Sequence, residues 1–384
     1  MHARVYISII WICFISLLAI GLMMVASTSA YAEFAEAKDT FNPYFQKQAF
    51  LALAGIIAAV GISRIDYRHL KNYIMWIWVG CTVLLILCYI PGIGKEINGE
   101  SRWIGFGSFT FQPSEIAKIG IMICVANWYS NHQEKCRHLY EGFIAPGIIF
   151  GIPVLLILCE KDMGTAAALS LSGFCLMLAG GSRWLLLILA AAGAAFILYY
   201  FVSSSENRMT RIDAWHDIEG TKLGAGRQQW LSTIAFARGG LTGSGLGAGL
   251  GKIGSIPEAH TDFIFATLGE ELGLIGTATV LLLFAIMAWA GLALALCIQD
   301  IFGRLLIVAF SCVIVWPAML NMMVVSAVLP NTGLPLPFIS YGGTNLFVTI
   351  LSIGLMTSVH IHAPRQQMMY WPRKQSLNHI KRKS

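Results

Sequence analysis

Polar residues that could do chemistry gather in four clusters of an otherwise apolar chain, and the first contains a cation and an acid–base pair. Arg102 is followed by Glu115 and Lys118. Glu115 and Lys118 are three residues apart, so a helix would place them on one face, where they could pair. Ionisable groups inside a membrane are costly and usually line a cavity. Two interpretations stay open: a substrate cavity, or an ion pair that only stabilises its helix.

The second and third clusters each contain a carboxylate at the border of an apolar segment. Asp162 lies in a short turn, residues 160–165, which would contain polar residues whatever its role. Asp262 lies where a long apolar run begins, and Glu258 precedes it by four residues. Partial desolvation tunes the proton affinity of such a carboxylate for general-base catalysis. Asp262 could equally cap the N-terminus of a helix.

The fourth cluster, residues 329–344, contains three prolines, several glycines and Ser340. At membrane depth, irregular backbone is tolerated only where it is buried in protein or lines a watery cavity. This cluster is therefore a stronger functional signal than any single charge. The glycine run at 243–249 has no strand before it, which excludes a phosphate-binding loop. We expect a close-packed or mobile loop there instead.

The composition predicts an all-α integral membrane protein, a bundle of about ten transmembrane helices. Of 384 residues, 57% are hydrophobic and 12% charged, whereas soluble domains carry about 25% charged residues. Apolar segments long enough to cross a bilayer recur, and in lipid they must be helical. The segment 263–297 exceeds one crossing, so it should be bent or partly interfacial. The predicted spans are 5–27, 48–63, 73–91, 113–129, 142–159, 164–180, 184–203, 263–297, 303–328 and 341–361.

The distribution of Lys and Arg predicts the orientation, because basic residues favour cytoplasmic loops. An even number of spans places both termini on one side, and most basic residues fall on that side, which is therefore cytoplasmic. Those residues are Arg4, Arg64, Arg68, Lys71, Lys135, Arg137, Arg183, Arg304, Arg365, Arg373, Lys374, Lys381, Arg382 and Lys383. The transmembrane domain is then 1–364. The loop 204–262, with an amphipathic piece around 228–238, is extracytoplasmic, and the basic tail 365–384 lies near anionic head groups.

Several classes of protein are excluded or disfavoured. The net charge of +6 sits in short loops and the tail, so nucleic acid is not an expected partner. Nine scattered cysteines form no Cys-x-x-Cys pair, and no zinc-type histidine spacing occurs, so neither a disulfide framework nor a metal site is supported. Ala30-Tyr31-Ala32 imitates a signal-peptide cleavage site, but the preceding apolar run is too long for one. We interpret it as an uncleaved first span.

Together the clusters resemble the SEDS family, which includes the division protein FtsW, the elongation protein RodA and the sporulation protein SpoVE. The resemblance covers nearly the whole chain and is greatest for the division branch, on residues 21–25 and 257–262. Its most specific segments are Arg102-Trp103-Ile104, Gln112-Pro113-Ser114-Glu115, and residues 257–266, 269–273 and 335–343.

The resemblance implies a peptidoglycan glycosyltransferase for bacterial cell division in the cytoplasmic (inner) membrane. Such proteins polymerise lipid II, an undecaprenyl-diphosphate-linked disaccharide-pentapeptide, by inverting transfer with release of undecaprenyl diphosphate. They work with a class B penicillin-binding protein and other divisome membrane proteins. The family's essential aspartate matches Asp262. A divalent cation, Mg or Mn, would suit the diphosphate, although no metal motif is visible. The candidate substrate-binding residues are Arg102, Glu115, Lys118, Asp162, Gln228, Glu258, His260, Thr261 and Ser340.

The chain departs from the family pattern at four positions. Glu160 and Lys161 replace Gln-Pro before Asp162, Leu231 replaces a glutamine, and Pro317 occupies a position that is commonly glutamine. These changes put the details of the substrate loops in doubt. The alternatives are a lipid II flippase, an elongation-type (RodA-like) polymerase or a non-catalytic scaffold. A flippase needs access from both faces, whereas all four clusters are predicted on the outer side.

Overall fold

The computed structural model describes residues 2–36, 43–97, 100–106, 109–203, 206–249 and 261–364. Ten of its helices coincide with the ten predicted spans. They are α1 (His2–Glu36), α2 (Pro43–Ser63), α3 (Ile74–Leu87), α4 (Pro113–Asn131), α5 (Ala145–Cys159), α6 (Met163–Ala179), α7 (Trp184–Ser203), α10 (Ile264–Leu296), α11 (Ile301–Val325) and α12 (Gly343–His362). Short turns of helix, η1 (Tyr67–Tyr73), η2 (Gln133–Lys135) and η3 (Tyr140–Ile144), lie between them.

The helices form the predicted membrane-spanning bundle. Within the described residues, seven helical segments are long and apolar enough to cross a bilayer, and two shorter ones, Met163–Ala179 and Trp184–Ile197, are also apolar. Large apolar side chains cover the outside of the bundle; Trp76 is 75% exposed and Phe196 is 71% exposed. Exposure of so much apolar surface to water would be costly, which is consistent with a lipid environment. The predicted fold class is therefore confirmed.

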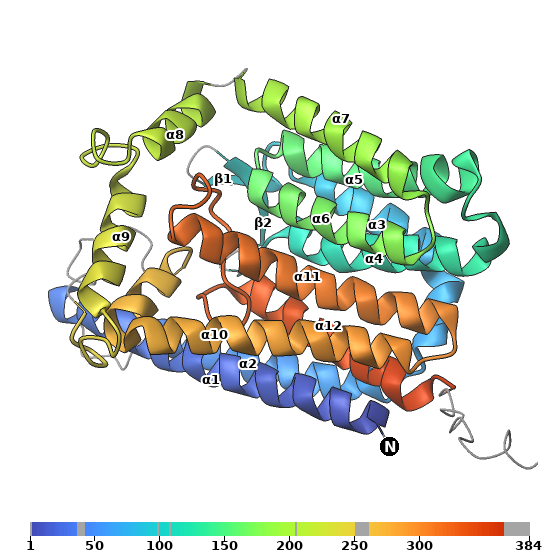
Figure 1. Ribbon diagram of the computed structural model, residues 1–384, viewed down its shortest axis with the longest axis horizontal. Coiled ribbons are helices and arrows are strands. Elements are labelled where there is room, and N and C mark those ends of the chain that lie inside the picture. The colour runs from blue at the N-terminus through green and yellow to red at the C-terminus, as the bar shows by residue number, and fades with distance from the viewer. Residues whose placement is uncertain are drawn as a thin grey trace, which may run out of the picture.

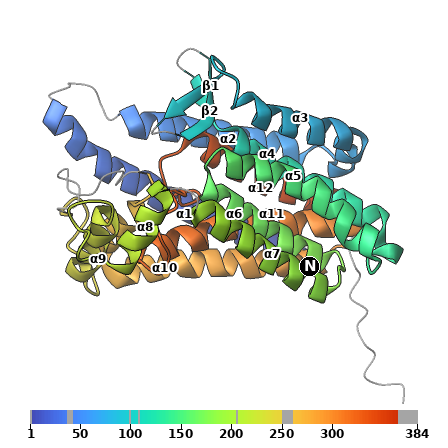
Figure 2. The same ribbon diagram turned by 90° about the horizontal axis from the view of Figure 1, so that it is seen from above.

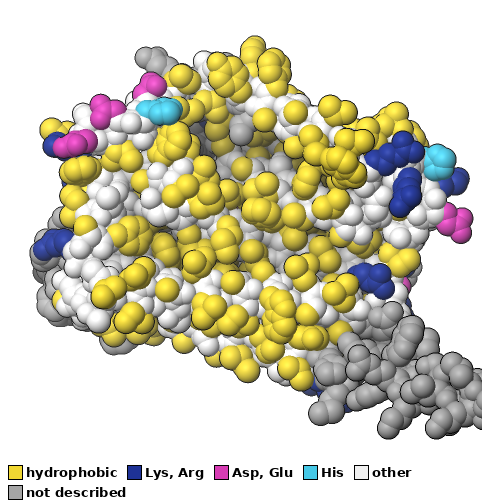
Figure 3. All heavy atoms as spheres, in the orientation of Figure 1, with side chains coloured by type: hydrophobic (Ala, Val, Ile, Leu, Met, Phe, Trp, Pro, Cys, Tyr) yellow, Lys and Arg dark blue, Asp and Glu magenta, His cyan; other side chains and the backbone are white. Residues whose placement is uncertain are grey.

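The start of α1 and the end of α12 lie at the same end of the bundle, as an even number of spans requires. In Figure 1 the start of α1 and the end of α12 are on the right, whereas α8 (Glu206–His216) and α9 (Arg227–Gly239) are on the left. Figure 2 shows the same separation from above. On the face drawn in Figure 3, apolar side chains fill the middle, and Lys and Arg gather mostly at the end with the termini.

Helix α10 is bent, as its length predicted. Gly273 has φ 66° and ψ −162°, which breaks the helix between its first turns and the long apolar portion. The backbone groups freed by the break are satisfied by the preceding loop: the Leu274 N–H donates to Gly240 O at 2.9 Å, and the Ile275 N–H to Leu241 O at 3.2 Å. A residue with a Cβ at 273 would overlap this loop. The bend therefore has an identifiable cause in glycine and loop hydrogen bonds.

The glycine run packs closely against α10, which confirms the first of the two expectations for it. The backbone N–H groups of Ser244 and Gly245 donate to Glu270 O and Glu271 O at 2.9 and 3.1 Å. A Cβ at Gly243 would overlap Glu271 O. The predicted amphipathic piece is α9 (Arg227–Gly239), whereas α8 (Glu206–His216) was not predicted.

A small antiparallel sheet, which was not predicted, lies between α3 and α4 and adds to the helical bundle. The strands β1 (Gly94–Ile97), β2 (Glu100–Phe106) and β3 (Phe109–Phe111) pair in the order β1-β2-β3. Side chains alternate along a strand, so Arg102 and Ile104 share one face of β2. Ile104 is buried, so this face packs on the bundle and directs Arg102 toward the helices.

Candidate functional site

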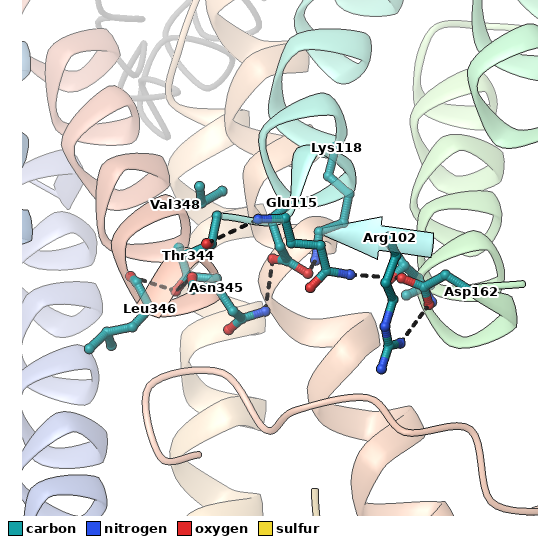
Figure 4. A network of polar contacts seen from close by, with 12 residues as sticks. Arg102, Glu115, Lys118, Asp162, Thr344, Asn345, Leu346 and Val348 are labelled. Atoms are coloured by element: carbon teal, nitrogen blue, oxygen red, sulfur yellow. Dashed lines mark hydrogen bonds and ion pairs between the residues drawn. The ribbon is translucent and has the colours of Figure 1, made fainter. Parts of the chain in front are cut away.

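Asp162 is the centre of a polar network at the end of the bundle opposite the chain termini (Figure 4). It is buried, and its Oδ1 accepts a hydrogen bond from the Thr165 N–H at 3.0 Å, so it caps α6. Gln112, at the start of α4, donates from Nε2 to Asp162 Oδ2 at 2.8 Å. Arg102 of β2 places Nη1 3.8 Å from Asp162 Oδ1. Segments far apart in sequence therefore meet at one carboxylate.

A second group of contacts surrounds the predicted pair of Glu115 and Lys118, whose pairing is confirmed. Lys118 Nζ lies 2.9 Å from Glu115 Oε1, and both side chains are buried. Asn345 of α12 donates from Nδ2 to Glu115 Oε2 at 2.9 Å (Figure 4). Thr344 accepts from the Gln112 N–H at 3.3 Å. This joins the pair to the Asp162 network. A role of the pair in substrate binding stays a prediction.

Asp262 is half-buried at the start of α10, in a segment that other elements hold in place. Asn321 of α11 donates from Nδ2 to both Asp262 O (2.8 Å) and Leu334 O (2.6 Å). Ser340 donates to Thr261 O at 2.6 Å. The N-cap residue of α10 is Phe263 and makes no side-chain cap hydrogen bond. Asp262 thus lies one residue before the N-cap, and its role as a general base stays a prediction.

The loop 327–342 connects Asp262 with the Asp162 network. A Cβ at Gly164, two residues after Asp162, would lie 2.6 Å from Leu334 Cγ and 3.0 Å from Thr332 O. A Cβ at Gly333, in the same stretch of loop, would lie 3.4 Å from Asp262 Oδ2. The absence of side chains at these two glycines permits the close approach. The first turn of α6 and the Asp262 segment therefore border one site.

Three further predicted site residues lie beside the loop 327–342 or in the Asp262 segment. Gln228 of α9 accepts a hydrogen bond from Asn331 Nδ2 at 2.5 Å, so it lies beside the same loop. Thr261 is half-buried. Ser340 is buried, and besides its bond to Thr261 it accepts from the Leu336 N–H at 2.7 Å, so its hydroxyl holds the loop together. Glu258 and His260 lie outside the described residues.

Several residues of the network were not singled out from the sequence. Asn345 was missed, although an amide in an otherwise apolar span is a signal that could have found it. Gln112 and Thr344 were noticed only as members of a motif. No group of three or more metal-ligating side chains occurs within the described parts of the chain, and the divalent cation stays a prediction. Of the departures from the family pattern, Leu231 packs against the core from α9, and Pro317 is buried in α11.

The turn before Asp162 has a backbone conformation that proline cannot adopt. Lys161 has φ 68°, whereas the proline ring fixes φ near −65°. The Lys161 N–H also donates to Leu158 O at 3.1 Å. The replacement of Pro by Lys in this chain is thus accompanied by a left-handed turn residue.

We expect Lys161→Pro to lower the free energy of unfolding by more than about 1 kcal/mol, because it imposes the wrong φ and removes a hydrogen bond. Thermal unfolding of the purified protein measures this. Lys161→Gly is the control, since glycine adopts positive φ without a steric penalty. Equal unfolding temperatures for the proline and glycine variants would show that the turn has another conformation.

The fold and site define a multi-pass helical membrane protein with a polar network at the end opposite its termini, beside a half-buried aspartate. Residues 7–365 match the family described as "Cell cycle protein", FtsW/RodA/SpoVE. The chain therefore belongs to the FtsW/RodA/SpoVE family, as its motifs predicted.

Named relatives and solved structures agree with this assignment. The chain is 36% identical over 354 residues to a "Probable peptidoglycan glycosyltransferase FtsW" of Geobacter metallireducens, covering 92% of this chain and 94% of that protein. It is 35% identical to "Stage V sporulation protein E" of Bacillus subtilis, covering 89% and 93%. A structure titled "Structural coordination of polymerization and crosslinking by a peptidoglycan synthase complex" is 24% identical with TM-score 0.77, covering 92% and 96%. The crystal structure of RodA from Thermus thermophilus is 23% identical with TM-score 0.67, covering 92% and 95%.

Proposed function

We propose that this protein is a peptidoglycan glycosyltransferase of the division type, which polymerises lipid II. The observation that carries the proposal is Asp262: a half-buried carboxylate, held by Asn321 and Ser340 through the backbone of its segment, beside the polar network. The names of the FtsW relatives support the activity, and the predicted activity agrees with them.

Asp262 supplies the base in this mechanism. Its carboxylate removes the proton from an acceptor sugar hydroxyl, and the oxygen attacks the anomeric carbon of the donor. The bond from that carbon to the lipid diphosphate breaks with inversion, and undecaprenyl diphosphate leaves with the bonding electrons. A base before α10, at the end of the bundle, suits a substrate whose lipid stays in the bilayer while its sugars lie outside.

Arg102 is better placed than Lys118 to stabilise the departing diphosphate. The Arg102 side chain is 22% exposed and lies at 3.8 Å from Asp162. The Lys118 side chain is 2% exposed and lies at 2.9 Å from Glu115. A preorganised cation stabilises charge where it develops in the transition state. Lys118 also fixes the start of α4 against α12 through Glu115 and Asn345, and it stays among the proposed substrate-binding residues. Glu115, Asp162, Gln228, Glu258, His260, Thr261 and Ser340 remain the proposed substrate-binding set, and a Mg or Mn ion would accompany the diphosphate.

The proposed setting is the bacterial cytoplasmic membrane, with both termini inside. The gathering of Lys and Arg at the end with the termini supports this orientation. The proposed partners are a class B penicillin-binding protein, which crosslinks the strands, and other divisome proteins. The similarity to a chain of a peptidoglycan synthase complex supports a partner of this kind.

Reconstitution tests the proposal. The full chain and its class B penicillin-binding protein are placed in sealed vesicles with labelled lipid II. We expect long glycan chains. Transport of lipid II across the membrane without polymer would indicate a flippase. The absence of both polymer and transport would contradict both functions. The protein should rescue cells that are depleted of their division polymerase. It should not rescue cells that are depleted of their elongation polymerase. This comparison separates FtsW-type from RodA-type use.

A further inference from the structure

Gln48 is a buried amide on α2 that the mechanism above does not use. Its side chain is 1% exposed, and a buried amide is costly unless its donor and acceptor are hydrogen-bonded. Both of its partners are backbone groups of one loop segment, residues 335–342. Gln48 Nε2 donates to Ser340 O at 3.0 Å, and Gln48 Oε1 accepts from the Gly342 N–H at 3.4 Å. The amide therefore ties this segment to α2 with its donor and its acceptor at once.

Ser340 connects this contact to the proposed base. Its hydroxyl donates to Thr261 O at 2.6 Å and accepts from the Leu336 N–H at 2.7 Å. Asp262 follows Thr261 directly in the chain. A shift of Ser340 would therefore move the backbone next to the carboxylate. Hydrogen bonds thus form a path from α2, through Ser340, to the Asp262 segment.

The helices behind the segment 335–342 are packed closely enough to support it rigidly. A Cβ at Gly21 of α1 would overlap Phe338 O, and the rings of Phe14 and Phe338 meet edge to face with centroids 5.2 Å apart. A Cβ at Gly354 of α12 would lie 2.7 Å from Ala59 O of α2. Groups supported by rigid elements are held more precisely than groups on loops alone. Gln48 thus joins the loop to a part of the bundle that can fix its position.

We propose that Gln48 is a positioning residue for glycosyl transfer, which sets through Ser340 where the Asp262 carboxylate lies relative to the acceptor hydroxyl. This inference rests on the proposed function for the role of Asp262. Asn321 of α11 holds the same loop at Leu334 O, so the two amides fix it at different points. Because Gln48 is buried behind the loop, its loss should slow the chemical step without weakening the binding of lipid II.

Gln48→Leu tests this expectation, since it removes both hydrogen bonds and keeps a side chain of similar bulk. The full chain is reconstituted with its class B penicillin-binding protein and labelled lipid II. We expect kcat for polymerisation to fall about 10²-fold, because a displacement of about 1 Å at the reacting groups can cost this much. The KM should stay within about twofold of the wild-type value, as expected when substrate binding is unaffected. An unchanged kcat, or a loss that lies entirely in KM, would overturn the inference.

Thr357→Val is the matched control for a purely structural effect. It removes the hydrogen bond that Trp11 Nε1 of α1 donates to Thr357 Oγ1 of α12 at 3.0 Å, nearer the end of α12 that lies with the chain termini. Both variants should lower the unfolding temperature by a few degrees, the usual effect of one lost hydrogen bond, but Thr357→Val should keep the wild-type kcat. Equal losses of kcat in the two variants would show that Gln48 serves stability alone.

A double-mutant cycle tests the path through Ser340. Ser340→Ala removes the hydroxyl that reaches Thr261 O. If Gln48 acts through this hydroxyl, the double variant should have the kcat of the slower single variant, because the two changes break one path. Losses of kcat that multiply would overturn the path.

Hydrogen exchange of the purified full chain tests the same path without substrate. Gln48→Leu should speed exchange of backbone amides in residues 335–342 and also in residues 261–268, whereas Thr357→Val should change neither. Unchanged exchange in residues 261–268 of Gln48→Leu would overturn the inference. If the wild-type protein forms no polymer, the proposed function is contradicted, while faster exchange in residues 261–268 would still support the positioning of this segment by Gln48.

Discussion

We expect Lys118→Met to lower the free energy of unfolding by about 3–5 kcal/mol, because it leaves Glu115 buried without its cation. The pair lies at 2.9 Å with both side chains buried, so water cannot replace the lost ammonium. Asn345 supplies one hydrogen bond to the carboxylate, which does not balance a full charge. Thermal unfolding of the purified protein in detergent measures the loss.

Two further variants separate the charge effect from other causes. Lys135→Met makes the same change at an exposed position of η2 and should alter stability by less than about 0.5 kcal/mol. Glu115→Gln combined with Lys118→Met removes both charges and should recover much of the loss, since replacing a buried pair by neutral groups is often close to neutral. If Lys118→Met and Lys135→Met unfold at the same temperature, the pair does not stabilise the bundle.

The fold could be predicted from local signals in the sequence, because each membrane span is a continuous run of apolar residues. Ten apolar runs gave ten helices, and the excess length of 263–297 predicted the bend that Gly273 produces. The small sheet was missed because its strands are only a few residues long, too short for a clear alternating pattern. No local pattern distinguishes Arg102 on a strand from Arg102 in an irregular loop.

The site was only partly predictable, because its residues come together through contacts between distant segments. The spacing of Glu115 and Lys118 determined their pairing. It could not indicate that Asn345 completes the pair from α12, or that Gly164 lies against Leu334. Glu160 was visible as a departure from the family pattern, but its burial appears only in three dimensions. The position of Asp262 one residue before the N-cap of α10 likewise appears only in the structure.

Asp262→Asn should reduce glycan polymerisation by about 10²–10⁴-fold, the usual contribution of a general base. Asparagine has nearly the same shape but does not accept the proton of the acceptor hydroxyl. Asn321 and Ser340 hold this segment through backbone carbonyl groups of Asp262 and Thr261, which the substitution leaves in place. The variant should therefore fold as wild type does, with an unchanged unfolding temperature. Asp300→Asn is unsuitable as a control, because Asp300 caps α11 and accepts from Tyr67.

The most direct test of the role of Asp262 is a paired measurement on wild type and Asp262→Asn, each reconstituted with the class B penicillin-binding protein. One assay follows the initial rate of polymerisation of labelled lipid II, and the other follows the binding of lipid II to the same preparation. If Asp262 is the base, the variant binds lipid II as wild type does and forms almost no polymer. Polymer formed at the wild-type rate by Asp262→Asn would contradict it.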